Sequence, residues 1–301
     1  MPTIMILGGY GAVGFYITRY LLQETNVNLI IAGRSKLKAA SVASQLSGLN
    51  NAAQERVNSM GVDAISHDSL RQAFSKIDAI VVAAPVMEHF TNIVDIAIES
   101  GTDCIDLVHT PNKYTYLQSK SVQITEAGCC FVTDVGLYPG IPGILARYAL
   151  NQKPDATSIR IAILSRPDWA GLAISDELAR EQLLASRDVK PGVHKRGKPR
   201  SRWRLGGGSK RIDFGEVFGV QSCAPVQLKE LEDISAFGQV REVSVWEGGF
   251  DSLLATTILP CARLHQRFKP SAQLTLWANG LRSLLSSNLS FVILSAVFIS
   301  Q

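Results

Sequence analysis

The sequence is poor in cysteine and shows no cysteine pattern. Its five thiols form no CxxC pair and have no histidines at ligand spacing; they are Cys104, Cys129, Cys130, Cys223 and Cys261. Unpatterned cysteines in odd number are typical of reduced thiols in an intracellular protein. We therefore predict no disulfide, no metal site and a cytoplasmic location.

The chain also lacks a basic leader and a long apolar run. Its first apolar segment starts directly after Met1 and Pro2, which argues against a signal peptide. Residues 289–299, LSFVILSAVFI, are strongly apolar but too short for a helix that crosses about 30 Å of hydrocarbon. Three interpretations stay open for this end: a buried strand or helix, a tail that makes the protein peripheral to a membrane, or an aberrant terminus.

Charged residues are scarce, at 19% against 46% hydrophobic residues, and this balance is typical of a packed globular protein. The net charge of +4 is too small to indicate nucleic-acid binding by itself. A chain of 301 residues is long for one core, so we expect two domains.

Apolar runs alternate with helical patterns through the first half of the chain. The predicted strands are residues 3–9, 27–35, 62–66, 77–85, 102–108 and 129–136. Helices are predicted between them; Asp68 is expected to cap one of these helices, and another is expected to span residues 112–127. This alternation predicts α/β architecture, a doubly wound parallel Rossmann sheet over residues 1–150. A strand at 158–164, a polar helix at 176–186 and further short strands then indicate a smaller α+β domain, residues 151–301, for substrate binding or dimerisation.

Several glycines lie between the first predicted strand and the first predicted helix. Gly9, Gly11 and Gly14 form a GxGxxG pattern directly after Gly8, with Tyr10, Ala12 and Val13 as the intervening residues. Such glycines allow a tight turn, close approach of a pyrophosphate and close helix packing. We predict that these residues bind a dinucleotide; the alternative is a glycine turn without a ligand.

No acid follows the second strand, where one would bind the ribose of NAD. The sequence there is AGRSK, with Gly33, Arg34, Ser35, Lys36 and then Lys38. A guanidinium can bind a phosphate through two hydrogen bonds. We therefore predict NADP as the cofactor, bound through Arg34, Ser35 and Lys38; the alternative for Arg34 is an exposed residue that begins the second helix.

Five motifs in order, GGYGAVG, IAGRS, DAIVVAAP, CIDLV and DVGLYPGIPG, resemble the saccharopine dehydrogenase-like family. The resemblance implies an NADP-linked oxidoreductase whose substrate lies between the two domains. By position it adds residues at the edge of the cofactor and near the nicotinamide: Ala84, Pro85, Gly136, Leu137 and Pro139. This chain departs from the family at Tyr138, where members typically have an acid followed by a histidine, so the resemblance does not extend to amino-acid chemistry.

Three polar residues near the carboxyl ends of predicted strands are the candidates for catalysis: Asp106, Asp134 and Tyr138. Each has an alternative role. Asp106 could cap the following loop, Asp134 could accept backbone hydrogens of the glycine turn, and Tyr138 could pack in the core. His109 is interpreted as a surface histidine.

A basic segment, residues 194–211, holds eight lysines and arginines around one tryptophan. It is consistent with a solvated loop, a loop that closes over an anionic ligand, or a nonspecific nucleic-acid arm. We predict no specific nucleic-acid partner.

Together these features predict an NAD(P)H-dependent oxidoreductase that acts on a small or lipid-like substrate, with homodimer formation left open. The alternative is a sensor or scaffold protein that binds NADP without turnover.

Overall fold

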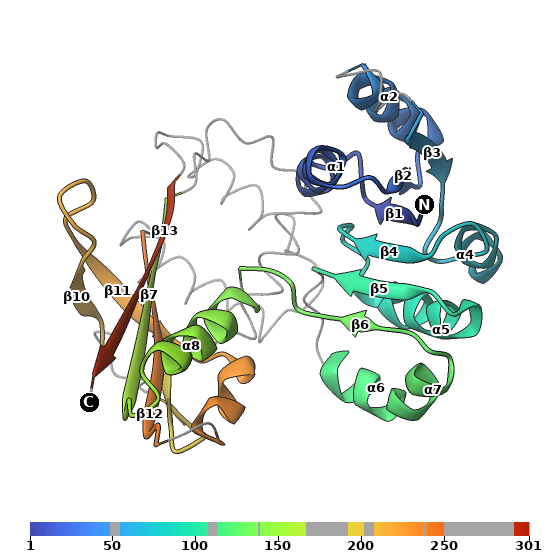
Figure 1. Cartoon of the computed structure of the whole chain (residues 1–301). Helices are drawn as coiled ribbons and strands as arrows, with labels where there is room; N and C mark the ends of the chain where they lie inside the picture. Colours follow the sequence, from blue (N-terminus) through green and yellow to red (C-terminus); the bar gives the residue numbers. More distant parts are fainter. Residues whose placement is uncertain are drawn as a thin grey trace, which may run out of the picture. The chain divides into compact units, whose positions relative to one another are not determined.

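The computed structural model describes residues 1–48, 55–107, 113–137, 139–166, 192–201, 208–236, 239–249 and 292–300 (Figure 1). The chain divides into two compact units, Met1–Gly136 and Leu137–Gln301. Each unit is described by itself. The division precedes the expected boundary near residue 150, because α8 (Ile141–Gln152) packs in the second unit, where Ala146 and Leu150 enter the apolar core.

The first unit is built on six parallel strands in the order β3-β2-β1-β4-β5-β6. The strands are β1 (Thr3–Leu7), β2 (Asn28–Gly33), β3 (Val57–Gly61), β4 (Ala79–Val82), β5 (Asp103–Asp106) and β6 (Phe131–Val132). The helices are α1 (Ala12–Glu24), α2 (Lys36–Ser47), α4 (His67–Phe74), the 3-10 turn η1 (Met87–His89), α5 (Phe90–Ser100), α6 (Lys113–Ser119) and α7 (Ser121–Glu126). This order confirms the predicted doubly wound fold, and the strand order reverses between β1 and β4, where such folds bind nucleotides.

Both faces of this sheet are buried, which explains the nearly continuous apolar strands in the sequence. On one face, Met5 and Ile80 pack with Phe74 of α4 and Ile93 of α5. On the other face, the side chains come from β2 and β3 and from α1 and α2; they include Leu22, Leu29, Ile31, Ala39 and Leu46. Burial of each large side chain contributes about 1.5–3 kcal/mol, so these two clusters fix the strand order.

The third strand differs from the prediction. The sequence pattern placed it at residues 62–66, but β3 is Val57–Gly61, which pairs with β2 from Leu29 to Gly33. Val62 is buried, yet the chain turns just after it, because the amide of Ile65 donates to the Asp63 carboxylate at 3.1 Å. The predicted segment is therefore a connection rather than a strand, with Val62 and Ala64 buried and Ile65 exposed.

Two helix details also differ. The Ser66 hydroxyl caps α4 by accepting a hydrogen bond from the amide of Ser69, so Asp68 lies in the first turn and is not the cap. The helix predicted at 112–127 is two short helices, α6 and α7, which meet at Lys120.

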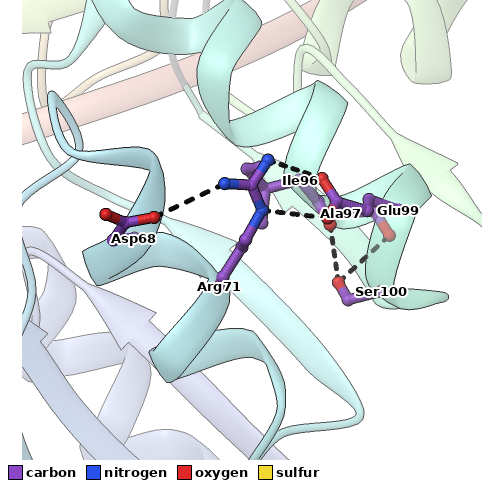
Figure 2. Close-up of polar contacts among 6 residues, drawn as sticks. All are labelled: Asp68, Arg71, Ile96, Ala97, Glu99 and Ser100. Carbon is purple, nitrogen blue, oxygen red and sulfur yellow. Dashed lines mark hydrogen bonds and ion pairs between the residues drawn. The ribbon is translucent and has the colours of Figure 1, made fainter.

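Arg71 joins α4 to α5 at the surface (Figure 2). Its Nε donates to Glu99 at 2.9 Å, and its Nη1 lies 3.5 Å from Asp68. The hydrogen bond from Arg71 lowers the pKa of Glu99. Because water screens exposed ion pairs, this cluster contributes little compared with the cores beneath it.

The second unit contains a mixed sheet in the order β10-β11-β12-β7-β13, with β8 pairing β12 and β9 (Figure 1). The strands are β7 (Ser158–Arg166), β8 (Gly192–Lys195), β9 (Lys198–Ser201), β10 (Lys210–Asp213), β11 (Val220–Val226), β12 (Glu242–Gly248) and β13 (Val292–Ser300). β7 and β12 are parallel, and the remaining pairs are antiparallel. α8 and the 3-10 helix η2 (Lys229–Ala236) pack on one face through Ile161 and Val245, while Trp246 is buried on the other.

The apolar C-terminal segment is a strand in this unit. Its backbone pairs antiparallel with β7 from Val292 opposite Arg166 to Ser300 opposite Ser158. Among the alternatives for this end, the strand is therefore the one that the structure contains. In the described ranges, no helix has the length and apolar character needed to cross a membrane. The polar helix predicted at 176–186 lies outside the described residues.

Candidate functional site

The glycine cradle follows β1 and leads into α1. Gly8 has a φ of +86°, and a Cβ there would lie 2.7 Å from the Ala83 carbonyl oxygen. A Cβ on Gly14 would overlap the Gly8 carbonyl, so the first turn of α1 packs directly on the strand end. The amide of Gly11 closes the turn by donating to the Gly8 carbonyl at 2.9 Å. Side chains at Gly8 or Gly14 would therefore push the cradle open.

The N-terminus of α1 is free to bind an anion. Its first hydrogen bond is donated by the amide of Phe15 to the carbonyl of Gly11, which leaves the preceding first-turn amides without intrahelical acceptors. Gly11 provides no side-chain cap, the first turn holds no acid, and Ala12 and Val13 are exposed. These amides and the positive end of the helix dipole would suit a pyrophosphate.

Tyr10 links the cradle to the end of β2. Its ring lies against Gly33, where an added Cβ would come 2.5 Å from Cε1 of Tyr10. The Tyr10 hydroxyl oxygen accepts a hydrogen bond from the amide of Ser35 at 3.4 Å. Ser35 in turn caps α2 by accepting from the amide of Lys38 at 3.3 Å. Tyr10 thus fixes the turn that presents the exposed Arg34.

We expect Gly33→Ala to destabilise the first unit by about 1–3 kcal/mol, because the new methyl group must displace the Tyr10 ring. Denaturant unfolding would measure the change. The double variant Gly33→Ala/Tyr10→Ala should lose less stability than the sum of the single variants. Strict additivity would show that the ring does not restrict residue 33.

The ends of β4 and β5 adjoin the cradle at the same edge of the sheet. Ala84 and Pro85 follow β4, and the amide of Ala84 lies next to Gly8, at 2.8 Å from a Cβ placed there. The amide of Leu107 donates to the Val82 carbonyl at 3.2 Å, so the chain after β5 is held against the end of β4. The predicted residues from the cradle, β2 and β4 therefore share one edge of the first unit.

Asp106 and Asp134 are joined by a buried lysine, and we call Asp106, Lys113 and Asp134 the buried triad. The Lys113 ammonium lies 2.6 Å from Oδ1 of each carboxylate. The side chains of Asp106 and Lys113 are 2% exposed, and that of Asp134 is 31% exposed. Burial raises the pKa of Asp106, and the charge of Lys113 opposes this rise. Both aspartates thus hold a cation, Lys113, and their catalytic role stays a prediction.

Lys113 was not predicted from the sequence, although a signal for it exists. It occupies the first turn of α6, where the helix dipole disfavours a cation. Its ammonium also lies 5.5 Å from the centre of the buried Phe90 ring. A lysine in this unfavourable position indicates that nearby carboxylates hold it there.

The remaining predicted residues lie at the end of the first unit, in the second unit or outside the described residues. Gly136 ends the first unit, whereas Leu137 and Pro139 belong to the second, where Leu137 packs against the core of α8 and β7. Tyr138 and His109 lie outside the described residues. Their roles stay predictions.

The basic segment is partly a β-hairpin. β8 and β9 are joined through Arg196, with a φ of +49°, and Gly197. Lys195 pairs with Glu242 at 3.1 Å, and the Lys210 ammonium lies 4.8 Å from the centre of the Trp246 ring. Residues 202–207 lie outside the described ranges. Within those ranges, no three His, Cys, Asp or Glu side chains are placed to hold a metal ion, and the described cysteines are free thiols.

Comparisons with known proteins agree with the geometry of the cradle. Residues 4–129 match the family described as the saccharopine dehydrogenase NADP binding domain. Over this range the chain is similar to a saccharopine dehydrogenase NADP-binding domain. NADP is the cofactor of this domain family, which confirms the predicted cofactor, and the open α1 terminus and Arg34 after β2 fit its phosphates.

Two solved structures are similar to this chain at low sequence identity, and the first of them shares its fold. The saccharopine dehydrogenase (L-Glu forming) of Saccharomyces cerevisiae is 19% identical with a TM-score of 0.66, and the match covers 86% of this chain. It covers 59% of the yeast chain, so this chain spans less than two thirds of that protein. A UDP-N-acetylglucosamine 3-dehydrogenase of Acidithiobacillus ferrooxidans is 12% identical, with a TM-score of 0.43 over 83% of this chain and 71% of that one. No curated protein sequence matches this chain.

His194 is a buried polar residue in the second unit. It is 2% exposed on β8, and both ring nitrogens lack a hydrogen-bond partner among the described residues. Desolvation lowers the pKa of His194, and the nearby charge of Glu232 opposes this shift. Burial therefore favours the neutral form of the imidazole.

We expect stability to fall as the pH drops below about 6.5, because the unfolded chain then binds a proton that folded His194 resists. One such group changes the free energy of unfolding by at most about 1.4 kcal/mol per pH unit. Denaturant unfolding between neutral and acidic pH would measure this slope. His194→Leu should flatten it; an unchanged slope would assign the acid sensitivity to other groups.

Proposed function

We propose that this chain is an NADP-dependent oxidoreductase that transfers a hydride between the nicotinamide and a small organic substrate. The observation that carries the proposal is the shared sheet edge: the glycine cradle, Arg34 after β2 and the ends of β4 and β5 all lie there, in a unit similar to an NADP-binding domain. Ligands of doubly wound folds bind at this edge, next to the strand reversal.

Different residues along this edge would bind different parts of the dinucleotide. The amides after Gly11 would hold the pyrophosphate, while Arg34, Ser35 and Lys38 would hold the 2′-phosphate. Ala84 and Pro85 would border the dinucleotide after β4. The bound cofactor supplies the hydride. Asp106 and Asp134 are the carboxyl groups that the first unit offers at the ends of β5 and β6, where charge develops during the transfer.

The first experiment is a fluorescence titration of the full chain with NADPH, followed by NADPH oxidation with a panel of carbonyl, imine and enoyl compounds. The panel includes hydrophobic compounds, because the apolar C-terminal segment is the basis for predicting a lipid-like substrate. Gly14→Val is the matched control, since its side chain would overlap the Gly8 carbonyl and close the cradle.

We expect NADPH to bind the parent chain and one compound class to accelerate its oxidation, with both effects absent in the control. A failure of NADPH to bind would contradict the proposal. Tight binding without oxidation across the panel would favour the alternative, a sensor or scaffold, which Tyr138 at the position of the family's acid also supports.

A further inference from the structure

We propose that the buried triad is an electrostatic element that favours the oxidised nicotinamide over the reduced one. NADP+ carries a positive charge on its nicotinamide ring, and NADPH does not. The inference rests on the proposed function, because it needs the dinucleotide at the carboxyl edge of the first unit. It assigns to Lys113 the role of a positioning residue.

The backbone connects the triad to the cradle in three steps. Gly8 lies against Ala83 at the end of β4. The amide of Leu107 donates to the carbonyl of Val82, and the amide of Val135 donates to the carbonyl of Asp106 at 3.1 Å. The triad therefore lies at the same edge as the cradle, beyond β4.

The position of the triad relative to the strand reversal between β1 and β4 determines which half of the dinucleotide would lie beside it. Arg34 follows β2, on one side of the reversal between β1 and β4, whereas Asp106 and Asp134 follow β5 and β6, on the other. In such folds the two mononucleotide halves bind on opposite sides of the reversal. Since Arg34 suits the adenosine phosphate, the triad lies on the nicotinamide side.

The charge of the triad has the sign that this role requires. Among the described residues, its two carboxylates and one ammonium sum to one negative charge when all three are ionised. Asp106 and Lys113 are buried, so the negative charge reaches solvent through Asp134, which is partly exposed. Charges near a protein surface interact more strongly than charges in bulk water.

Lys113 and the backbone together fix the direction of Asp134. Asp134 has a φ of +60°, a left-handed conformation that Asp adopts more readily than most residues. Its Oδ1 contacts the Lys113 ammonium, and the amide of the next residue, Val135, donates to the backbone carbonyl of Asp106. These contacts hold the carboxylate at the edge rather than leaving it free to rotate into solvent.

The test compares the dissociation constants of NADP+ and NADPH for the full chain. Asp134→Asn removes the net negative charge of the triad with almost no change of shape. We expect it to weaken NADP+ relative to NADPH by about three- to tenfold, since only the oxidised ring is charged. Lys113→Arg keeps the cation and should leave the ratio near that of the parent.

Asp68→Asn is the matched control, because it removes an exposed carboxylate from α4 of the same unit and alters the total charge equally. We expect no change in its ratio. An Asp134→Asn ratio equal to that of the parent, with both dinucleotides bound, would overturn this inference alone and leave the triad a structural ion-pair cluster. Absence of binding of either dinucleotide to the parent would instead contradict the proposed function.

Discussion

Arg34→Ala is expected to weaken NADPH binding by about 10- to 100-fold and to leave NADH binding nearly unchanged. Hydrogen bonds to charged groups contribute about 1.5–3 kcal/mol each, and the exposed guanidinium after β2 can offer two of them to one phosphate. The adenosine ribose of NADH lacks that phosphate. Parallel fluorescence titrations with NADPH and NADH would give the two affinities.

Arg19→Ala controls for the loss of an exposed arginine, because Arg19 lies on α1, far along the helix from the cradle. Its two affinities should match those of the parent. Arg34→Lys should be intermediate, since lysine keeps the charge but not the planar pair of donors. If Arg34→Ala retained the parent's preference for NADPH, selection of the phosphate would have to be assigned elsewhere.

The cradle and the phosphate-selecting turn could be predicted because their determinants are local in sequence. Gly8 and Gly14 act on each other across one turn, and Arg34 follows a strand whose apolar run ends clearly. The third strand was misplaced because Val62 and Ala64 alternate like a half-buried strand, whereas the actual strand, VNSMG, holds only two large apolar residues. Tertiary pairing with β2 overrides that local pattern.

The partnership of Asp106, Lys113 and Asp134 could not be predicted from spacing alone. Asp106 and Asp134 are far apart in the sequence and meet only because β5 and β6 are adjacent and parallel. Lys113, at the start of α6, then has to lie at the same edge. The pairing of β13 with β7 is a second long-range contact of this kind, and it decides the conformation of the apolar end.

The same lysine gives the largest expected effect on stability. Lys113→Met should lower the free energy of unfolding by about 3–5 kcal/mol, because it removes a cation 2.6 Å from two carboxylates, one of them buried. Such a loss is a large fraction of the 5–15 kcal/mol that is typical of a folded domain. Denaturant unfolding of the parent and the variant at several pH values would measure it.

The loss of stability caused by Lys113→Met should increase as the pH rises from acid to neutral. Burial already raises the pKa of Asp106, and removal of Lys113 raises it further, because the charge and hydrogen bond of Lys113 are the largest influences that lower it. A carboxyl group whose pKa is raised on folding stabilises the fold when protonated, and this contribution is lost as the pH rises through the folded pKa. The difference between the parent and Lys113→Met should therefore be smallest in acid and grow toward neutral pH.

Lys120→Met is a close control for this experiment. The Lys120 ammonium lies 2.9 Å from Asp95 and 5.5 Å from the centre of the Tyr116 ring, a geometry like that of Lys113 above Phe90, but its side chain is 28% exposed and that of Asp95 is 41% exposed. We expect only a small loss there, since water screens the pair. Asp106→Asn should restore part of the stability of Lys113→Met, because it removes the buried charge that the lysine balanced. Equal losses in the two lysine variants, or no rescue by Asp106→Asn, would show that the buried triad does not hold the ends of β5 and β6 together.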